Sequence, residues 1–507
     1  MTHHPKRVAI VGGGISGLIH AHVLRKNGFE PVVFEKAREV GGVWAVAYPG
    51  VRLQNLDFHY HVSDFPWPSA PDPHPTGEQI RAYWSAFVDA LGLDVRLGHE
   101  AVAAEERPDG WALTTRHDGV ERTEAYDFLV VATGQYTDGK HRPRFDGEER
   151  FRGAIGTERD ARAPEDFAGQ RVAVVGFGKS ALDMAAAASA HGAEVHHVFR
   201  TPRWALPREL LGVHISWFLF NRFGSVMMTS WAHPTAAERF LHRELSFVVN
   251  GFWRGIESVF RWDARRHARG TGAEGLARVE RVLPKHPVVL DLRSAAAIAP
   301  DGYFRRVAEG KIVPHHAAVT GFDEDGLRLD DGTRVACDRV VLSLGSESPR
   351  FPFLPEKYRA LLEGEPDGAQ LYRHIVHPRI PRLGFAGFNH GFMHVPAAEV
   401  GAQWLACLFR GDLALPPPEA MERSIERVRA WKRAHIAFEP SRSCAVNTRY
   451  QQYIDILLGD LGVSPYRKLP NVLAEVFARY GSSDYVGVFG EVPPRGARPR
   501  EPLPLDT

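Results

Sequence analysis

The sequence predicts an α/β protein with two Rossmann-like dinucleotide-binding domains, a helical insertion and a C-terminal helical extension. Three observations support this fold class. A glycine-rich turn follows a short apolar run at residues 8–11, a second such turn follows residues 171–175, and a long stretch rich in aromatic residues and arginine comes after it. The 507 residues suffice for two or three domains. We expect a first nucleotide domain in two parts (1–155 and 341–440), a second one at 156–340 with the insertion at about 205–287, and the extension at 441–507.

The first unit begins with the β-branched run Val8–Val11, which is typical of a buried parallel strand. Gly12-Gly13-Gly14-Ile15-Ser16-Gly17 follows and opens a helical pattern, and a second strand then ends in Glu35. In such a turn Gly12 permits the tight bend, Gly14 lets the backbone approach a pyrophosphate, and Gly17 lets helix and strand pack closely. The helix N-terminus binds the pyrophosphate, and Glu35 accepts hydrogen bonds from a ribose diol. This site suits FAD.

The second unit repeats the pattern and differs at its end. The strand Arg171–Val175 leads into Gly176-Phe177-Gly178-Lys179-Ser180-Ala181, and the strand after the helix ends in Arg200, with Arg203 close behind. A carboxylate there would repel the 2′-phosphate of NADPH, whereas an arginine pairs with it. The second site therefore favours NADPH over NADH. The alternative is that these arginines form surface salt bridges.

The remaining pattern completes the two domains. We expect strands near 100–104, 111–115, 127–134, 310–312, 325–334, 338–344 and 383–388, and helices at 78–91 and 397–409. The apolar stretch Leu210–Phe220 is about half as long as a membrane span; we expect an internal hydrophobic helix there, with membrane contact as the alternative. The proline-rich tail at 494–507 is expected to be disordered.

Composition argues against several other classes of protein. The formal net charge of +1 gives no strong field for nucleic acid or an anionic membrane. The three cysteines are isolated, which fits a reducing cytosol and predicts neither a disulfide framework nor a zinc site. The short N-terminal segment leaves no room for a signal peptide. We expect a cytoplasmic protein without a membrane anchor and without a metal. The local histidine pairs (His59/His61, His315/His316, His390/His394) lack carboxylate or thiolate partners at ligand spacing.

Taken together, the motifs resemble those of the flavin-containing monooxygenases, the class B flavoproteins that also include Baeyer–Villiger enzymes and N-hydroxylases. The resemblance runs from residue 8 to about 410 through GGGISGL, GGVW, YPGVRLQ, SDFPWP, VATG, GFGKSALD, LYRHIVHP and GFNHGF…AAEVGAQW. It implies that NADPH reduces FAD, that O2 forms a C4a-hydroperoxyflavin, and that this species oxygenates a small molecule. A disulfide reductase shares both nucleotide folds but would need a redox cysteine pair early in the chain.

The resemblance also implies the site residues. Gln54 and Asn55 are expected to steady the oxygen-carrying flavin through an amide, and Asn389, with His390, to face the flavin or the substrate. The expected FAD contacts are Gly12, Gly14, Ser16, Gly17, Glu35, Lys36, Gly42, Val43, Trp44, Val102, Thr133 and Gly134. The expected NADPH contacts are Gly176, Gly178, Lys179, Ser180 and Arg200. The expected partners are a small-molecule substrate and O2, with a homodimer as the assembly.

Several positions depart from the family pattern. In the hallmark FxGxxxHxxx(F/Y)(K/R), which would begin at Phe151, the histidine is replaced by Thr157 and the aromatic by Ala161, while Arg162 is kept. This stretch couples NADP binding to catalysis in the family. Gln54 stands where the Baeyer–Villiger pattern has an aspartate. The sequence thus favours oxygenation of nitrogen or sulfur, with a Baeyer–Villiger reaction on a ketone, an uncoupled NADPH oxidase or a non-oxygenating flavoprotein as alternatives.

Overall fold

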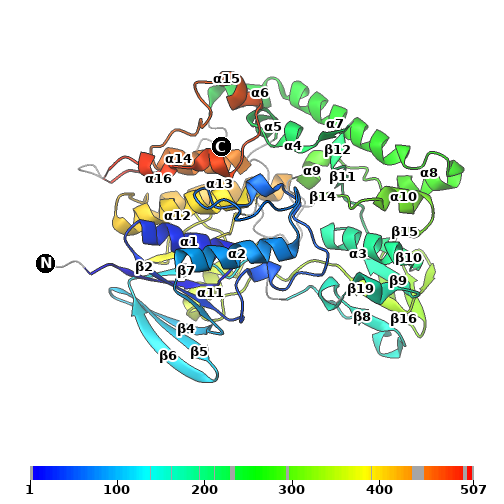
Figure 1. The fold of residues 1–507 in the computed structure, drawn as a ribbon, viewed down its shortest axis with the longest axis horizontal. Helices are drawn as coiled ribbons and strands as arrows, with labels where there is room; N and C mark the ends of the chain where they lie inside the picture. The colour runs from blue at the N-terminus through cyan, green and yellow to red at the C-terminus, as the bar shows by residue number, and fades with distance from the viewer. Residues whose placement is uncertain are drawn as a thin grey trace.

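A computed structural model describes residues 4–136, 139–161, 163–192, 194–210, 212–228, 235–292, 296–389, 391–436, 450–494 and 499–504. The first domain is built on a five-stranded parallel sheet with the order β20-β7-β1-β2-β3 (Figure 1). Its strands are β1 (Arg7–Val11), β2 (Glu30–Glu35), β3 (Val95–Leu97), β7 (Phe128–Val131) and β20 (Leu383–Phe385). The last strand comes from far along the chain, so the C-terminal half completes the first sheet.

Helices and a small second sheet cover this domain. Helix α1 (Ile15–Lys26) packs against α12 (His394–Arg410), and both are buried along most of their length. Helix α2 (Gly77–Leu91) begins at a capping box formed by Thr76 and Gln79. An antiparallel sheet of β4 (Glu100–Arg107), β5 (Gly110–His117) and β6 (Val120–Tyr126) packs through Trp111 and Leu113 on the other face.

The second domain repeats the design with the strand order β15-β10-β9-β19-β8, again all parallel. Its strands are β8 (Ala154–Gly156), β9 (Arg171–Val175), β10 (Glu194–Phe199), β15 (Ile312–His316) and β19 (Arg339–Leu342). Helix α3 (Lys179–Ala190) follows β9, and the antiparallel strands β16 (Val319–Asp323), β17 (Gly326–Leu329) and β18 (Arg334–Ala336) flank the sheet. Strand β8 lies at the predicted domain boundary near residue 155.

The insertion is mainly helical and forms the upper right of Figure 1. It contains α4 (Ser216–Leu219), α5 (Arg222–Met227), α6 (Ala236–Arg243), α7 (Ser246–Arg266), α8 (Gly272–Arg281) and α9 (Val288–Leu292), followed by α10 (Tyr303–Ala308). Two short strands, β11 (Ala205–Leu206) and β14 (Ala297–Ile298), pair in parallel at its base.

The prediction of a single internal helix over Leu210–Phe220 is wrong. The chain instead makes an antiparallel pair of β12 (Glu209–Leu210) and β13 (Val213–His214), and only the four residues of α4 are helical. Gly212 has φ +80°, a left-handed conformation that ends any helix. Trp217 is 48% exposed rather than internal. Within the described ranges, no helix has the length and apolarity needed to cross a membrane.

The helix Tyr450–Asp460 of the C-terminal part packs against α12, and the helix Val472–Phe477 packs against α5 of the insertion. The C-terminal part comprises α11 (Glu356–Leu362), α13 (Pro418–His435), α14 (Tyr450–Asp460), α15 (Val472–Phe477) and α16 (Val488–Glu491). The prediction of a disordered tail is wrong for residues 499–504. Arg500 donates to the carbonyl of Leu461 at 2.7 Å, and the N–H of Leu503 donates to Asp460 Oδ1 at 2.8 Å. These buried partners fix a segment whose composition alone favours disorder.

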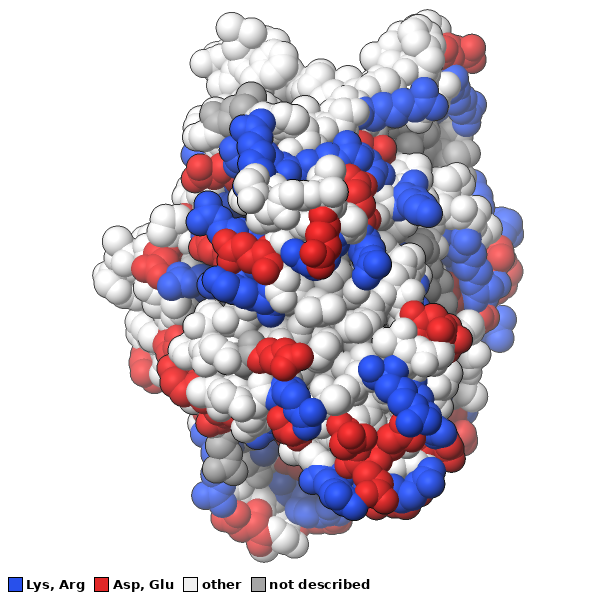
Figure 2. All heavy atoms as spheres, turned by 90° about the vertical axis from the view of Figure 1, so that its right-hand side faces the viewer, with Lys and Arg blue, Asp and Glu red and all other residues white. Residues whose placement is uncertain are grey.

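Charges are mixed on the face that presents the second domain. Figure 2 shows Lys and Arg interspersed with Asp and Glu there, while the upper left projection is largely without either. Among the described residues on this face, no broad patch of one sign appears, in keeping with a formal net charge of +1.

Candidate functional site

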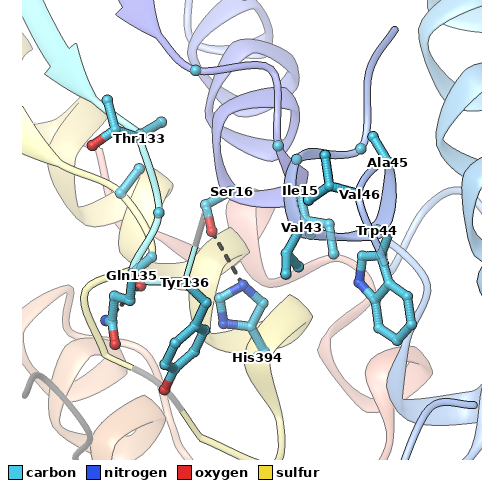
Figure 3. A pocket seen from close by; sticks show the side chains of 18 of the residues that line it. Ile15, Ser16, Val43, Trp44, Ala45, Val46, Thr133, Gln135, Tyr136 and His394 are labelled. Carbon is cyan, nitrogen blue, oxygen red and sulfur yellow. Dashed lines mark hydrogen bonds between the residues drawn. The ribbon is translucent and has the colours of Figure 1, made fainter. Parts of the chain in front are cut away.

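A cavity of about 580 Å³ opens at the carboxyl edge of the first sheet. Its wall combines segments that are far apart in the sequence (Figure 3): the first glycine turn, the 3-10 turn Gly42–Trp44, the loop 51–55, the segment Thr133–Tyr136 and the start of α12. Ligands of parallel α/β sheets bind at this edge. The cavity is therefore the candidate functional site.

In the first glycine turn, two glycines are packed closely against the backbone and a third leaves space for a ligand. Gly12 has φ +116°, and a Cβ on it would lie 2.3 Å from the carbonyl oxygen of Ala132. A Cβ on Gly17 would lie 2.0 Å from the carbonyl oxygen of Gly12. A Cβ on Gly14 would meet only ordinary contacts, the nearest being Gly42 Cα at 3.6 Å. Gly12 and Gly17 are required by the protein itself, whereas Gly14 keeps space free at the cavity.

Helix α1 begins at the same turn. Its N-cap is Gly14, which has no side chain to accept from the first N–H groups. The first residues of α1 line the cavity, so the free donors and the positive end of the helix dipole can bind an anion there. Glu35 lies at the end of β2, is 8% exposed, and accepts from the N–H of Gly13 at 2.6 Å and of Ala37 at 2.8 Å. The residues fit a dinucleotide whose pyrophosphate lies at α1 and whose ribose lies at Glu35.

Most of the other predicted FAD contacts also lie in the cavity wall. These are Ser16, Lys36, Gly42, Val43, Trp44, Thr133 and Gly134. Gly17 lies behind the wall, and Val102 is outside it, although its neighbour Ala101 is part of it. Trp44 is held by a hydrogen bond from its Nε1 to the hydroxyl of Tyr60 at 2.7 Å. This contact keeps an apolar ring in place beside the glycine turn.

The two candidate amides are both in the wall, and each is tied to another segment. Gln54 Oε1 accepts from the N–H of Ile298 in β14 at 3.0 Å. Asn55 is 7% exposed, and its Nδ2 donates to the carbonyl of Phe392. Because the Gln54 oxygen is engaged, its NH2 group is the part left to donate into the cavity. Asn389 is buried but does not line the cavity, and His390 lies outside the described residues.

His394 is a wall residue that sequence reasoning did not assign to the site. Its Nε2 lies 3.1 Å from Ser16 Oγ, so the first residue of α12 contacts the first turn of α1 (Figure 3). Burial lowers the pKa of His394 to about 4, so its ring is neutral near pH 7. The sequence placed it only in a local pair with His390. Its position at the start of a helix directly after a turn was the available signal.

The second glycine turn resembles the first in geometry. Gly176 has φ +125°, and a Cβ there would lie 2.3 Å from the carbonyl oxygen of Ser343. Helix α3 starts after Gly178, again without a capping side chain. Lys179 forms an ion pair with Asp183, which also accepts from the hydroxyl of Tyr48 at 2.6 Å. Of the predicted NADPH contacts only Lys179 borders the large cavity, while Gly176, Gly178, Ser180 and Arg200 lie outside its wall.

The two arginines after β10 have different environments. Arg200 is exposed at the strand end, where it can reach a phosphate. Arg203 instead pairs with Asp291, Nη1 to Oδ1 at 3.1 Å. Asp291 is fully buried, lines the cavity and also accepts from the N–H of Trp204 at 2.8 Å. A buried carboxylate therefore holds the guanidinium of Arg203, as the salt-bridge alternative expected for this residue, and Arg200 is the arginine left for a 2′-phosphate.

The altered hallmark segment has a structural role of its own. Thr157 caps a short 3-10 turn, Glu158–Asp160, by accepting from the N–H of Arg159. Glu158 is buried and pairs with Lys140. Arg162 lies outside the described residues. Throughout the described part of the chain, no cluster of His, Cys, Asp and Glu side chains could hold a metal ion.

Comparison with known proteins matches this architecture. A model of the family described as flavin-binding monooxygenase-like matches residues 5–250 and 286–475. A probable flavin-containing monooxygenase 1 of Arabidopsis thaliana is 29% identical over 94% of this chain and 96% of its own length. Flavin-containing monooxygenase 5 of Cavia porcellus is 26% identical over 91% of this chain and 83% of its own length.

Two solved structures show the same fold. An open structure of cyclohexanone monooxygenase has a TM-score of 0.67 at 17% identity and covers 90% of this chain and 98% of its own. The S-allyl-L-cysteine S-oxygenase from Allium sativum has a TM-score of 0.61 at 20% identity, covering 91% and 89%. The predicted fold class, with two dinucleotide-binding domains, is confirmed.

Proposed function

The chain belongs to the flavin-binding monooxygenase-like family, and we propose that it oxygenates a nitrogen or sulfur atom of a small molecule. Membership confirms the prediction of an oxidoreductase that uses FAD, NADPH and O2. The overall reaction consumes NADPH, a proton, O2 and the substrate, and yields NADP+, water and the oxygenated substrate. A cytoplasmic location and a homodimer stay predictions.

We assign the cofactor contacts to the two glycine turns. The N-terminus of α1 would hold the pyrophosphate of FAD, with Gly14 as the point of close approach and Glu35 at the ribose. The N-terminus of α3 would hold NADPH, and Arg200 its 2′-phosphate. When bound there, FAD would supply the redox chemistry between NADPH and O2 and the transfer of one oxygen atom to the substrate.

The observation that carries the choice of substrate atom is the pair of amides, Gln54 and Asn55, in the cavity wall. Both are fixed by backbone partners, and neither ionises, so they can donate hydrogen bonds to oxygen without adding charge. Oxygenation of a soft nitrogen or sulfur atom uses the substrate's own lone pair and needs no acid or base from the protein. Gln54 occupies the position of the Baeyer–Villiger aspartate, which disfavours the ketone reaction.

Exclusion of water is the second contribution that we assign to the wall. Trp44, Val43 and Tyr60 present apolar surface between the glycine turn and the loop 51–55. A dry cavity strengthens the amide hydrogen bonds and slows loss of the activated oxygen as peroxide.

The test supplies purified holoenzyme with NADPH, oxygen-18-labelled O2 and one of three probes: methyl phenyl sulfide, N,N-dimethylaniline or cyclohexanone. Products and peroxide are quantified by chromatography with mass detection and by a peroxide assay. We expect labelled sulfoxide or N-oxide at much higher kcat/KM than lactone. Lactone as the main product would overturn the heteroatom proposal, and peroxide without product would establish the uncoupled alternative.

Variants of the amides test the residues. Gln54→Leu or Asn55→Leu is expected to lower coupled product formation by about 100-fold, the typical cost of one preorganised donor. The control is Asn250→Leu on the exposed face of α7, which keeps wild-type turnover. FAD content and circular dichroism verify that each variant is folded. Unchanged coupling in both amide variants would refute their assignment.

A further inference from the structure

Two histidines from different parts of the chain meet beside the loop that carries Gln54 and Asn55. His74 precedes α2, and His214 is the last residue of β13 in the insertion. Their Nε2 atoms are 3.1 Å apart, and their ring centroids 5.2 Å. His74 is 7% exposed. This contact connects the helical insertion to His74, which in turn contacts Leu53 and Asn55 of the cavity wall.

The partners of the two rings fix where their protons are. His74 Nδ1 lies 3.1 Å from the carbonyl oxygen of Leu53 and 3.0 Å from that of Asn55, and carbonyls only accept, so Nδ1 carries a proton. His214 Nδ1 accepts from the N–H of Ser216 at 3.1 Å, so it is bare. In the neutral rings His214 Nε2–H must then donate to the bare Nε2 of His74. A single added proton would put two N–H groups face to face.

His74 holds the candidate catalytic loop through more than its ring. The N–H of Leu53 donates to the carbonyl of Pro75 at 2.9 Å, and Arg52 Nη1 donates to the carbonyl of His74 at 3.0 Å. The residues around His74 thus form one side of a small ladder, and the loop 51–55 forms the other. A displacement of His74 would displace the backbone on both sides of Gln54.

We propose that His74 and His214, with Ser216, form a pH-sensitive clasp by which the insertion positions the Gln54–Asn55 loop. Both residues act through that loop and are positioning residues. The proposal rests on the proposed function, since the clasp matters for turnover only if the two amides serve the reaction. The clasp explains how the insertion can affect coupling, although Gln54 and Asn55 lie outside it.

The surroundings of the clasp keep both rings neutral. Burial is the main cause that lowers the pKa of His214, to about 4, with the cationic partners Arg479 and Arg208 and the neighbouring His74 adding to it. Burial also lowers the pKa of His74, and Arg208 and Lys179 contribute. Arg479 Nη1 donates to Ser216 Oγ at 3.2 Å and completes the chain of hydrogen bonds.

The direction of the pH effect follows from these shifts. The folded protein prefers neutral rings, so the clasp is intact above the ordinary histidine pKa and is lost as the pH falls through the lowered values. We therefore expect the peroxide released per NADPH to be constant from neutral pH to about pH 5 and to rise as the pH falls further toward about 4.

Three single variants of the holoenzyme separate the clasp from general packing. His214→Gln keeps an N–H donor for neutral His74 and can turn its amide oxygen to accept from a protonated His74, so it is expected to match wild type at neutral pH and to stay flat toward acid. His214→Phe keeps the ring without a donor and is expected to raise uncoupling about fivefold at every pH, the effect of one hydrogen bond. His315→Phe, which breaks the remote His196–His315 contact of 3.0 Å, is the control with the wild-type profile.

Nitrogen-15 NMR of the histidine rings gives a readout independent of turnover. We expect the Nδ1–H tautomer for His74 and the Nε2–H tautomer for His214, with the latter signal absent from His214→Phe. A wild-type coupling profile in His214→Phe, or the opposite tautomers, would overturn the clasp. If the expected tautomers are found while the Leu variants of Gln54 and Asn55 keep full coupling, the function assigned to the amides fails instead.

Discussion

Replacing Gly14 by alanine should weaken FAD binding while leaving the fold intact. In the first glycine turn only this position has room for a Cβ: its nearest neighbour would be Gly42 Cα at 3.6 Å, an ordinary contact. The same change at Gly17 would bring a Cβ within 2.0 Å of a carbonyl oxygen, so that variant should fail to fold. Gly14→Ala therefore separates the space needed by the ligand from the space needed by the protein.

The expected size of the effect follows from what the methyl group displaces. It would lie where the pyrophosphate approaches the first N–H groups of α1, whose N-cap is Gly14. An anion at a partly buried helix N-terminus gains up to about 2 kcal/mol from the dipole and the free N–H groups. Loss of that interaction corresponds to about 30-fold weaker FAD binding.

The assay is a titration of FAD-depleted protein with FAD, followed by quenching of flavin fluorescence. Circular dichroism and urea unfolding of the apoprotein check that Gly14→Ala is as stable as wild type. The matched control is Gly251→Ala on the exposed face of α7, where an added Cβ meets no atom within 4 Å. Equal FAD affinity in wild type and Gly14→Ala would refute the placement of the pyrophosphate at α1.

Three further predictions concern stability and cofactor choice. Asp460→Ala leaves the guanidinium of Arg373 buried without its bidentate partner and should cost about 3–5 kcal/mol in urea unfolding; a loss no larger than that of Glu422→Ala, at an exposed pair, would contradict this. Arg200→Glu should raise KM for NADPH about 30-fold without raising that for NADH, and an unchanged ratio would place the 2′-phosphate elsewhere. Burial raises the pKa of Glu399 to about 8, so the stability that protonated Glu399 contributes is complete below the ordinary carboxyl pKa and is lost as the pH rises through about 8. Glu399→Gln should therefore remove this alkaline loss of stability in thermal unfolding. The same loss in the variant would contradict the assignment to Glu399.

The sequence predicted the parts of the fold that depend on neighbouring residues. A strand, a glycine turn and a helix are specified within about 20 residues, because the turn geometry leaves only glycine at Gly12 and Gly176. The sequence predicted the order of the strands in the first sheet less directly, because β20 joins this sheet from more than two hundred residues after β7. Its apolar pattern was visible, and the chain was expected to return to the first domain there, but the strand beside which it lies was not predicted.

The failures share a physical cause, which is a partner distant in sequence. The sequence did not show that Arg203 pairs with Asp291, which lies 88 residues later in the chain. The composition of the tail predicts disorder, because it gives no information about its hydrogen bonds to Asp460 and Leu461. The stretch 210–220 has the apolarity of a buried helix, but the left-handed Gly212 and the pairing of β12 with β13 prevent a single helix there.

The same long-range contacts determine how the cavity can be tuned. Gln54 is held by Ile298 and Asn55 by Phe392. His74 holds the backbone on both sides of Gln54, and its ring is held in turn by His214. Each of these holders belongs to a segment outside the loop 51–55. A substitution in the insertion can therefore move the amides while every residue of the cavity wall stays the same. Because one displaced hydrogen bond is worth about fivefold, differences in coupling between members of this family should be sought in these holding contacts as well as in the side chains that face the substrate.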